Sequence, residues 1–225
     1  MDVRDAVASR YSCRAFLPTP IPEKTVRNIL ERASRAPSGG NVQPWRVHVL
    51  AGSRLDALRD IVRSRFDELP RFEGGEYDIY PPGLKEPYES RRQRAGVMLY
   101  QSIGVTREDR AGRYRQYGRN YLFYDAPVGL FFSIDRSMGR PQWSDLGGYI
   151  QTVMLLARGY GLDACAQEAW THLHKTLYSF LNIPPEYIIF CGMALGHADR
   201  TAPINTWRSP RAPVDEFATF EGFDS

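Results

Sequence analysis

The 225-residue sequence predicts an α+β protein, in which helices and strands both contribute to the core. Apolar residues recur at helical spacing in several segments, as Val26, Ile29 and Ala33 do. Other segments have the patterns of strands: residues 46–52 alternate, and residues 126–135 form an unbroken apolar run. Neither an internal repeat nor a linker divides the chain, so we expect a single domain.

The first half of the chain begins with a short amphipathic helix. Pro22 opens the second helix, which ends before a loop rich in Pro, Gly, Ser and Asn. The alternating strand follows this loop, and residues 54–66 form the next helix. Residues 68–119 are the least regular part of the chain, with many Pro, Gly and Tyr residues, and we expect two helices there, at about 86–103 and 107–121.

The second half of the chain contains the longest predicted helix, residues 145–161. We expect Ser144 to cap its start and Gly161 to end it. Its apolar residues leave almost no polar face, so the helix should be buried on most sides. Three more elements follow: a short strand at 162–170 that leads into a turn, a helix at 174–182 and a last strand at 187–197.

Composition and charge exclude several classes of protein. The net charge is +3, from 29 Lys and Arg against 26 Asp and Glu, and no dense basic stripe occurs, so we expect no nucleic-acid partner. No apolar run approaches the length of a membrane span, and the first residues lack the apolar core of a signal peptide, so we expect no membrane partner either. The three cysteines are too far apart for a disulfide framework, which favours a cytoplasmic location.

The segment RYSCRAF, residues 10–16, carries two arginines and a serine at every second position. In an extended backbone, side chains at i, i+2 and i+4 point to the same side, so Arg10, Ser12 and Arg14 should converge. Two guanidinium groups and a hydroxyl suit a phosphate or another anion with several oxygens. The alternative is a solvated basic strand edge.

The loop PSGGNVQPW offers polar groups beside two glycines that permit close approach of another backbone. Ser38, Asn41 and Gln43 supply both donors and acceptors, which the edge of a heterocycle requires. The alternative is an ordinary turn between a helix and a strand.

Two further groups of polar residues have open interpretations. Glu168, just beyond a strand, is a general base, a surface charge, or the residue whose backbone N–H matters. Arg208 and Arg211 either complete an anion site begun by Arg10 and Arg14 or are surface charges.

The pair His172 and His174 has no third ligand nearby, and Cys13 fits a packing position, so we expect no metal site.

Taken together, these segments resemble the FMN-dependent nitroreductase family, in particular its nitrobenzoate-reductase-like branch. The resemblance extends from Arg10 to Arg211. It rests on motifs that occur in the family's order: RYSCR, APSGGNVQPW, a long helix that ends in GYGL, AQEAW, and a basic NTWRSPR.

The resemblance implies that FMN binds at four groups of residues. Arg10 matches residues that hold the phosphate together with Arg208 and Arg211. Arg14 matches a cation near the N1–O2 edge of the flavin, where it would stabilise the charge of the reduced ring. The full set of residues implied to bind the cofactor is Arg10, Tyr11, Ser12, Arg14, Pro37, Ser38, Gly39, Asn41, Ala166, Gln167, Glu168, Ala169, Arg208 and Arg211. Pro37 to Asn41 belong to a loop that reaches the flavin of the other subunit.

The family fold is a mixed, mostly antiparallel sheet flanked by helices, in an intertwined homodimer. By the resemblance, residues 1–225 form one such domain, with a longer helical insert or lid at 68–125 and a dimer-wrapping tail at 209–225. The implied activity is reduction of nitroaromatic or quinone-type acceptors by NAD(P)H through a ping-pong mechanism, so small aromatic substrates are expected. The flavin carries the chemistry, and no side chain is expected to be a catalytic acid or base.

The sequence departs from the family at the turn over the flavin, where many members have Pro and Gly and this chain has Gln167 and Ala169. Two alternatives therefore remain open. One is a flavin-dependent reductive dehalogenase or dehydrogenase on the same scaffold. The other, of a different class, is a non-catalytic flavin- or RNA-binding protein.

Overall fold

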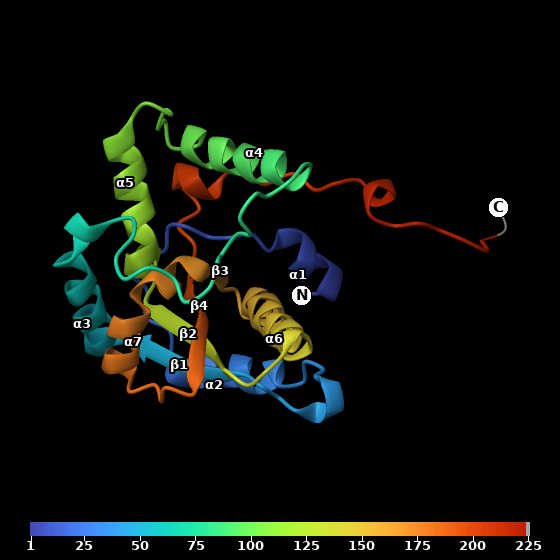
Figure 1. Cartoon of the computed structure of the whole chain (residues 1–225), viewed down its shortest axis with the longest axis horizontal. Helices are drawn as coiled ribbons and strands as arrows, with labels where there is room; N and C mark the ends of the chain where they lie inside the picture. The colour runs from blue at the N-terminus through green and yellow to red at the C-terminus, as the bar shows by residue number, and fades with distance from the viewer. Residues whose placement is uncertain (224–225) are drawn as a thin grey trace.

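A four-stranded sheet lies at the centre of the computed structural model, which describes residues 1–223 (Figure 1). The strands are β1 (Arg46–Ala51), β2 (Val128–Asp135), β3 (Asp163–Gln167) and β4 (Tyr187–Gly196), in the order β1-β2-β4-β3. All three pairs of strands are antiparallel. The parallel component of the expected mixed sheet is a single bridge between Ser12 and Ala164.

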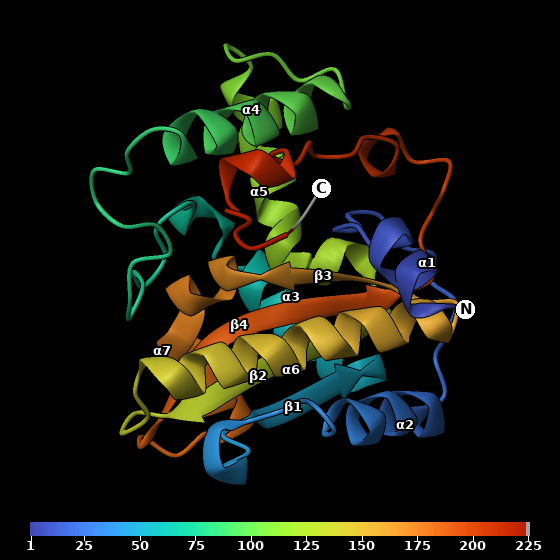
Figure 2. The same cartoon turned by 90° about the vertical axis from the view of Figure 1, so that its right-hand side faces the viewer.

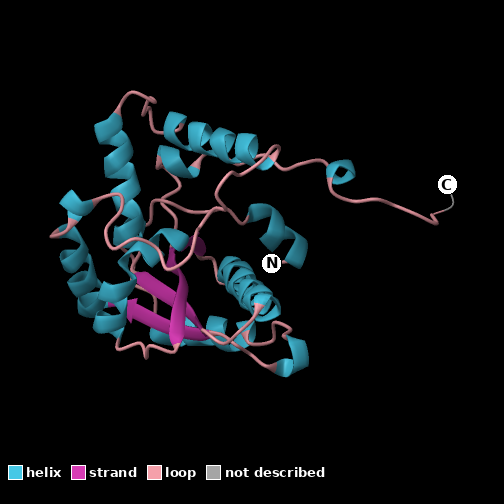
Figure 3. Ribbon diagram, in the orientation of Figure 1, coloured by secondary structure: helices cyan, strands magenta, loops and turns pink. Residues whose placement is uncertain are grey.

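Helices cover both faces of the sheet, which confirms the predicted α+β class (Figure 3). Helices α2 and α6 lie on one face, and α3 and α7 on the other (Figure 2). The helices are α1 (Val3–Ser9), α2 (Glu23–Ala33), α3 (Gly52–Arg63), α4 (Tyr88–Gln101), α5 (Arg110–Gly118), α6 (Arg140–Gly159) and α7 (His174–Leu181). No helix in residues 1–223 is both long enough and apolar enough to cross a membrane.

The continuous apolar run in β2 results from this two-sided burial. Phe131 points into the core under α3 and α7, whereas Leu130 and Phe132 point into the core under α2 and α6. All three side chains are fully buried. Since neighbouring strand residues face opposite sides, a strand that is buried on both faces carries apolar residues at consecutive positions; in β2 the buried Ser133 is the exception.

Helix α6 begins earlier than the sequence indicated, and the prediction that Ser144 caps it was wrong. The helix starts at Arg140, and the Gln142 side chain accepts a hydrogen bond from the Gly139 N–H at 3.2 Å. This hydrogen bond gives the backbone N–H at the start of the helix a partner. The first turn is therefore helical although its polar residues do not follow an apolar pattern. The expected end is confirmed, because Gly161 has a φ of 73° just after the helix.

The region between α3 and β2 contains the two expected helices, α4 and α5. Helix α4 buries no residue and lies away from the sheet (Figure 1). After α5 the chain turns through a 3-10 segment, Arg119–Asp125, in which Phe123, Tyr124 and Asp125 have positive φ values. Positive φ is strained for side chains of this size, and the burial of the Phe123 and Tyr124 rings offsets the strain.

We expect Gly129→Ala to destabilise the fold by about 1–3 kcal/mol through overpacking. A Cβ atom at Gly129 would lie 2.6 Å from the Phe123 ring. That ring cannot move away, since it packs 4.7 Å from Trp170 and 5.5 Å from Phe131 between ring centroids. Urea denaturation measures the change. Gly159→Ala, which meets no neighbour within 4 Å, is the control and should leave the midpoint unchanged or raise it.

Candidate functional site

The extended segment at residues 10–16 runs along β3, the edge strand of the sheet. The Cys13 N–H donates to the carbonyl of Ala164 at 3.2 Å, next to the bridge between Ser12 and Ala164. Burial alternates along the segment: Tyr11, Cys13 and Ala15 are buried, while the side with Arg10, Ser12 and Arg14 is only half-buried. The structure therefore places the two arginines and the serine on one side, as the spacing indicates.

Asn205 attaches this segment to the C-terminal part of the chain. Its side chain accepts a hydrogen bond from the Arg14 N–H at 2.8 Å and donates to the carbonyls of Ala15 and Asp199, both at 2.8 Å. Asn205 is buried, so these bonds are shielded from water. The contact brings the residues that follow, Trp207 to Arg211, beside Arg14.

Arg10, Arg14, Arg208 and Arg211, here called the arginine cluster, lie on the segments that Asn205 joins, and the Arg14 guanidinium carbon is 5.9 Å from the centroid of the Trp207 ring. The Arg208 guanidinium stacks 3.8 Å from the centroid of the Tyr11 ring. Burial, and then the nearby charge of Arg211, lower the pKa of Arg10. Among residues 1–223, none of these four arginines pairs with a carboxylate. Four unpaired guanidinium groups make a site for an anion.

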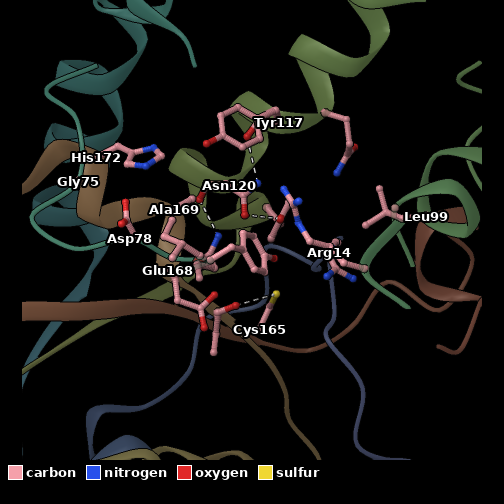
Figure 4. A pocket seen from close by; sticks show the side chains of 18 of the residues that line it. Arg14, Gly75, Asp78, Leu99, Tyr117, Asn120, Cys165, Glu168, Ala169 and His172 are labelled. Carbon is pink, nitrogen blue, oxygen red and sulfur yellow. Dashed lines mark hydrogen bonds between the residues drawn. The ribbon is translucent and has the colours of Figure 1, made fainter. Parts of the chain in front are cut away.

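A cavity of about 570 Å³ opens beside this arginine cluster (Figure 4). Arg14 and Leu99 lie on one side of it, and Asp78, Glu168 and His172 on the other. Its wall includes part of the predicted set, namely Arg14, Ala166, Gln167, Glu168 and Ala169. These residues come from the extended segment and from the turn at the end of β3.

Gln167, at which the sequence departs from the expected motif, makes a contact between two segments of the chain. Its side-chain amide donates to the carbonyl of Asn120 at 2.7 Å, which joins the turn after β3 to the segment after α5. The Gln167 Oε1 atom is buried and has no hydrogen-bond partner. A buried acceptor without a partner, at the wall of a cavity, fits a donor group on a ligand.

The loop with Pro37, Ser38, Gly39 and Asn41 lies elsewhere in the same chain. Its Gly39 N–H donates to Asp145 of α6 at 3.2 Å, and none of the four residues lines the cavity. All four are exposed or half-buried. One chain by itself does not bring this loop to the arginine cluster.

Two polar cavity residues were not found from the sequence. Gln116 and Asn120 reach the cavity from α5 and the turn after it, beside Tyr124 of the tyrosine-rich insert. Tyr124 donates to Asn120 at 2.5 Å, and burial raises the pKa of Tyr124. No local pattern marks these residues, because their place depends on how α5 packs over the end of β3.

Arg14 lies next to Tyr124 and Cys165. Burial lowers the pKa of Arg14, but Cys165 and Tyr124 beside it raise the pKa above its ordinary value overall. The guanidinium therefore keeps its charge in a half-buried position.

His172, for which the sequence offers no third metal ligand, lines the cavity. Burial lowers the pKa of His172, so its imidazole is neutral at pH 7 and can both donate and accept. His174 instead makes backbone contacts, to the carbonyls of Gly74 and Thr171, both at 3.1 Å. In residues 1–223 no group of three or more His, Cys, Asp or Glu side chains could hold a metal ion.

The fold and this arginine-lined cavity define a class of α+β proteins with helices on both faces of the sheet and an anion site at its edge. Comparison with known proteins identifies the class: the model of the nitroreductase family matches residues 7–197, and the chain belongs to this family.

Individual relatives match over almost the whole chain. A 4-nitrobenzoate reductase from Pseudomonas putida is 38% identical, with 99% of this chain and 97% of the relative covered. The crystal structure of the FMN and NADPH-dependent nitroreductase NfnB from sphigopyxis sp. strain HMH is 43% identical, with a TM-score of 0.95 and 99% and 100% of the two chains covered. That of NfnB from Mycobacterium smegmatis in complex with NADPH is 27% identical, with a TM-score of 0.92 and 97% of each chain covered.

We expect Asn205→Ala to lower the free energy of unfolding by about 2–4 kcal/mol, since it leaves the Arg14 N–H and the Asp199 carbonyl without this partner, whereas the Ala15 carbonyl keeps the Asp199 N–H. Thr206→Ala is the control, because its exposed hydroxyl donates only to the carbonyl of Pro203, and a loss below about 0.5 kcal/mol is expected. Thermal and urea unfolding measure both variants. Equal stability of the two would contradict the role of Asn205 as the attachment point.

Proposed function

We propose that this protein is an FMN-dependent oxidoreductase that reduces nitroaromatic or quinone-type acceptors with NAD(P)H. The observation that carries the proposal is the cluster of four arginines without carboxylate partners beside a cavity at the sheet edge. Its position in a nitroreductase-family fold supports the same function, as do the names of the relatives.

The residues present fit FMN. Arg10, Arg208 and Arg211 would hold the phosphate, because two or more guanidinium groups match its charge and its oxygens. Arg14 would face the pyrimidine edge of the ring, and the backbone of residues 166–169 the opposite edge. When bound, FMN supplies the capacity to accept a hydride from a reduced pyridine nucleotide and to pass it to an acceptor. The protein binds and orients the cofactor and excludes water, and we propose no side chain as an acid or base.

We further propose that the protein works as a homodimer. Met154, Leu155 and Leu156 of α6 are only half-buried, although the helix is apolar nearly all round. Phe217, Phe220 and Phe223 are 72%, 62% and 80% exposed on an extended tail. Apolar surface of this kind is typical of an interface, and the exposed loop at residues 37–41 would then reach the partner's cavity.

The insert at residues 68–125 is proposed as a lid over the cavity that sets substrate choice. Tyr80, Tyr100 and Tyr117 line the cavity from this region. Tyrosines suit an aromatic substrate, since they stack and also form hydrogen bonds. The competing role for α4 and α5 is packing at the dimer interface.

A cytoplasmic location is proposed from the cysteines. Cys13, Cys165 and Cys191 are free thiols that are buried, and burial raises the pKa of Cys13 to about 12. Buried thiols of raised pKa are structural rather than reactive, which suits a reducing compartment.

The protein should purify yellow with FMN, and Arg10→Ala should weaken FMN binding by about 1.5–3 kcal/mol, the value of a charge-assisted hydrogen bond. Titration of the apoprotein with FMN, followed by flavin fluorescence, measures the affinity. Arg4→Ala, which removes an exposed arginine that pairs with Asp2, is the control and should bind FMN normally. A protein that cannot be reconstituted with FMN would end the proposal.

Deletion of the residues after Arg211 should shift the monomer–dimer equilibrium toward the monomer and loosen FMN, because the three exposed phenylalanines are lost. Sedimentation velocity over a range of concentrations measures the first effect and flavin fluorescence the second. Serine at Phe217, Phe220 and Phe223 should reproduce the deletion. A wild-type monomer with full activity would contradict the dimer itself.

Alanine at Tyr80 or at Tyr100 should change the ranking of nitroaromatic substrates by kcat/KM while FMN affinity stays within about twofold, an effect below roughly 0.5 kcal/mol. Tyr114→Ala serves as the control from the same insert, since this exposed side chain does not line the cavity. An equal loss for every substrate, together with lower stability, would favour the packing role.

A further inference from the structure

A second, larger cavity adjoins the first. Its volume is about 1120 Å³, and it is bounded by α4, the turn after it, α5 and Trp207. The two cavities share Arg14, Tyr80, Arg92, Gly96, Leu99 and Tyr100 in their lining, so they adjoin along this stretch. A long ligand that crosses this stretch would extend from the inner cavity, beside the turn after β3, into the outer one.

The charged residues that line the outer cavity are all positively charged. Arg92, Arg107 and Arg113 line it together with Arg14, and no Asp or Glu does. Among residues 1–223, none of the first three pairs with a carboxylate, whereas the neighbouring Arg91 pairs with Glu216 at 2.6 Å. Like charges without partners repel each other, so this arrangement is stabilised when an anion enters.

Tyrosine rings hold two of these arginines against the wall. The Arg92 guanidinium carbon lies 4.1 Å from the centroid of the Tyr80 ring, and that of Arg113 lies 4.2 Å from Tyr100. Stacking uses the flat faces of the guanidinium groups and leaves the N–H groups at their edges available for oxygens of a ligand. The Arg113 side chain is half-buried, which strengthens its interaction with an anion.

The size of the outer cavity decides which anion fits. The inner cavity, at about 570 Å³, is lined by the residues proposed to face the flavin ring, so the ring and a single-ring substrate would share it. The remaining space, lined by Arg107, Arg113 and Trp207, suits a longer ligand that carries phosphates and a flat base.

We propose that the outer cavity binds the phosphate-bearing adenosine end of the reduced pyridine dinucleotide, with Arg107 and Arg113 as the residues that hold its phosphates. The inference rests on the proposed function, since the nicotinamide end must then lie in the inner cavity. It predicts that NADPH is preferred to NADH, because the additional 2′-phosphate adds negative charge in a cavity with unpaired cations.

Direct binding tests the proposal without turnover. The probe is 2′-phospho-ADP-ribose, which has the phosphates and adenosine of NADPH but no nicotinamide, titrated into the FMN-loaded protein by calorimetry. Loss of a charge-assisted bond should weaken binding about tenfold for Arg107→Gln and for Arg113→Gln. Arg115→Gln, also on α5 but outside both cavities, is the matched control and should bind the probe like the wild type. A wild type that does not bind the probe, or variants that bind it equally well, would overturn the proposal.

Flavin reduction distinguishes this inference from the proposed function. The reductants are NADPH and 1-benzyl-1,4-dihydronicotinamide, which has no phosphate, and anaerobic stopped-flow absorbance follows the flavin. The ratio of the NADPH rate to the benzyl-dihydronicotinamide rate at low concentration should fall about tenfold in each variant. If neither reductant bleaches the flavin of the wild type, the proposed function fails. If both do and the ratio is unchanged in the variants, only the inference fails.

The alternative ligand of these arginines is a carboxylate group on the aromatic substrate. The half-reaction in which the substrate reoxidises the reduced enzyme distinguishes the two ligands. The reduced enzyme is mixed with 4-nitrobenzoate or with nitrobenzene. The ratio of the two rates should be the same in the wild type and the variants. A tenfold change in that ratio with unchanged binding of 2′-phospho-ADP-ribose would assign the arginines to the substrate and overturn the proposal.

Discussion

The site depends on one constraint, the attachment of residues 10–16 along the edge of the sheet. The backbone of Cys13 bonds to Ala164, and Asn205 joins the same segment to the end of the chain. The apolar side of the segment is buried in the core, so its arginines have only the opposite side available. Three parts of the chain that are far apart in sequence thereby meet at the end of β3.

The arginines of this protein have two different physical roles. Arg158 is buried and pairs with the buried Asp163 at 2.6 Å, which connects α6 to β3 within the fold. By contrast, Arg10, Arg14, Arg208 and Arg211 have no carboxylate partner in residues 1–223 and remain partly exposed. Unpaired cations of this kind lower stability without a ligand, and an anionic ligand that binds the folded state should raise it.

The residues of α4 that line both cavities make few contacts with the two hydrophobic cores. Helix α4 buries no residue; its Arg92 stacks on Tyr80, which precedes the helix, and its Tyr100 stacks with Arg113 of α5. Segments with few buried contacts open more easily than the core, and such segments are where ligands commonly enter. The rigid sheet edge therefore supplies one side of the site and the adaptable insert the other.

Local patterns in the sequence determined the secondary structure and the side on which the arginines lie, because side-chain periodicity depends only on neighbouring residues along the chain. The helical spacing of Val26, Ile29 and Ala33 and the apolar run of β2 both correspond to elements of the fold. The start of α6 was misplaced, since the contact from Gln142 to Gly139 has no apolar signature.

The tertiary structure alone decided which residues surround the cavity. Asn120 and His172 carry no local signal, and the packing of α5 and of the turn after β3 puts them there. The same packing separates the loop at residues 37–41 from the arginine cluster within one chain. Contacts between segments distant in sequence are set by the fit of whole elements in the core, which the pattern of any single segment does not contain.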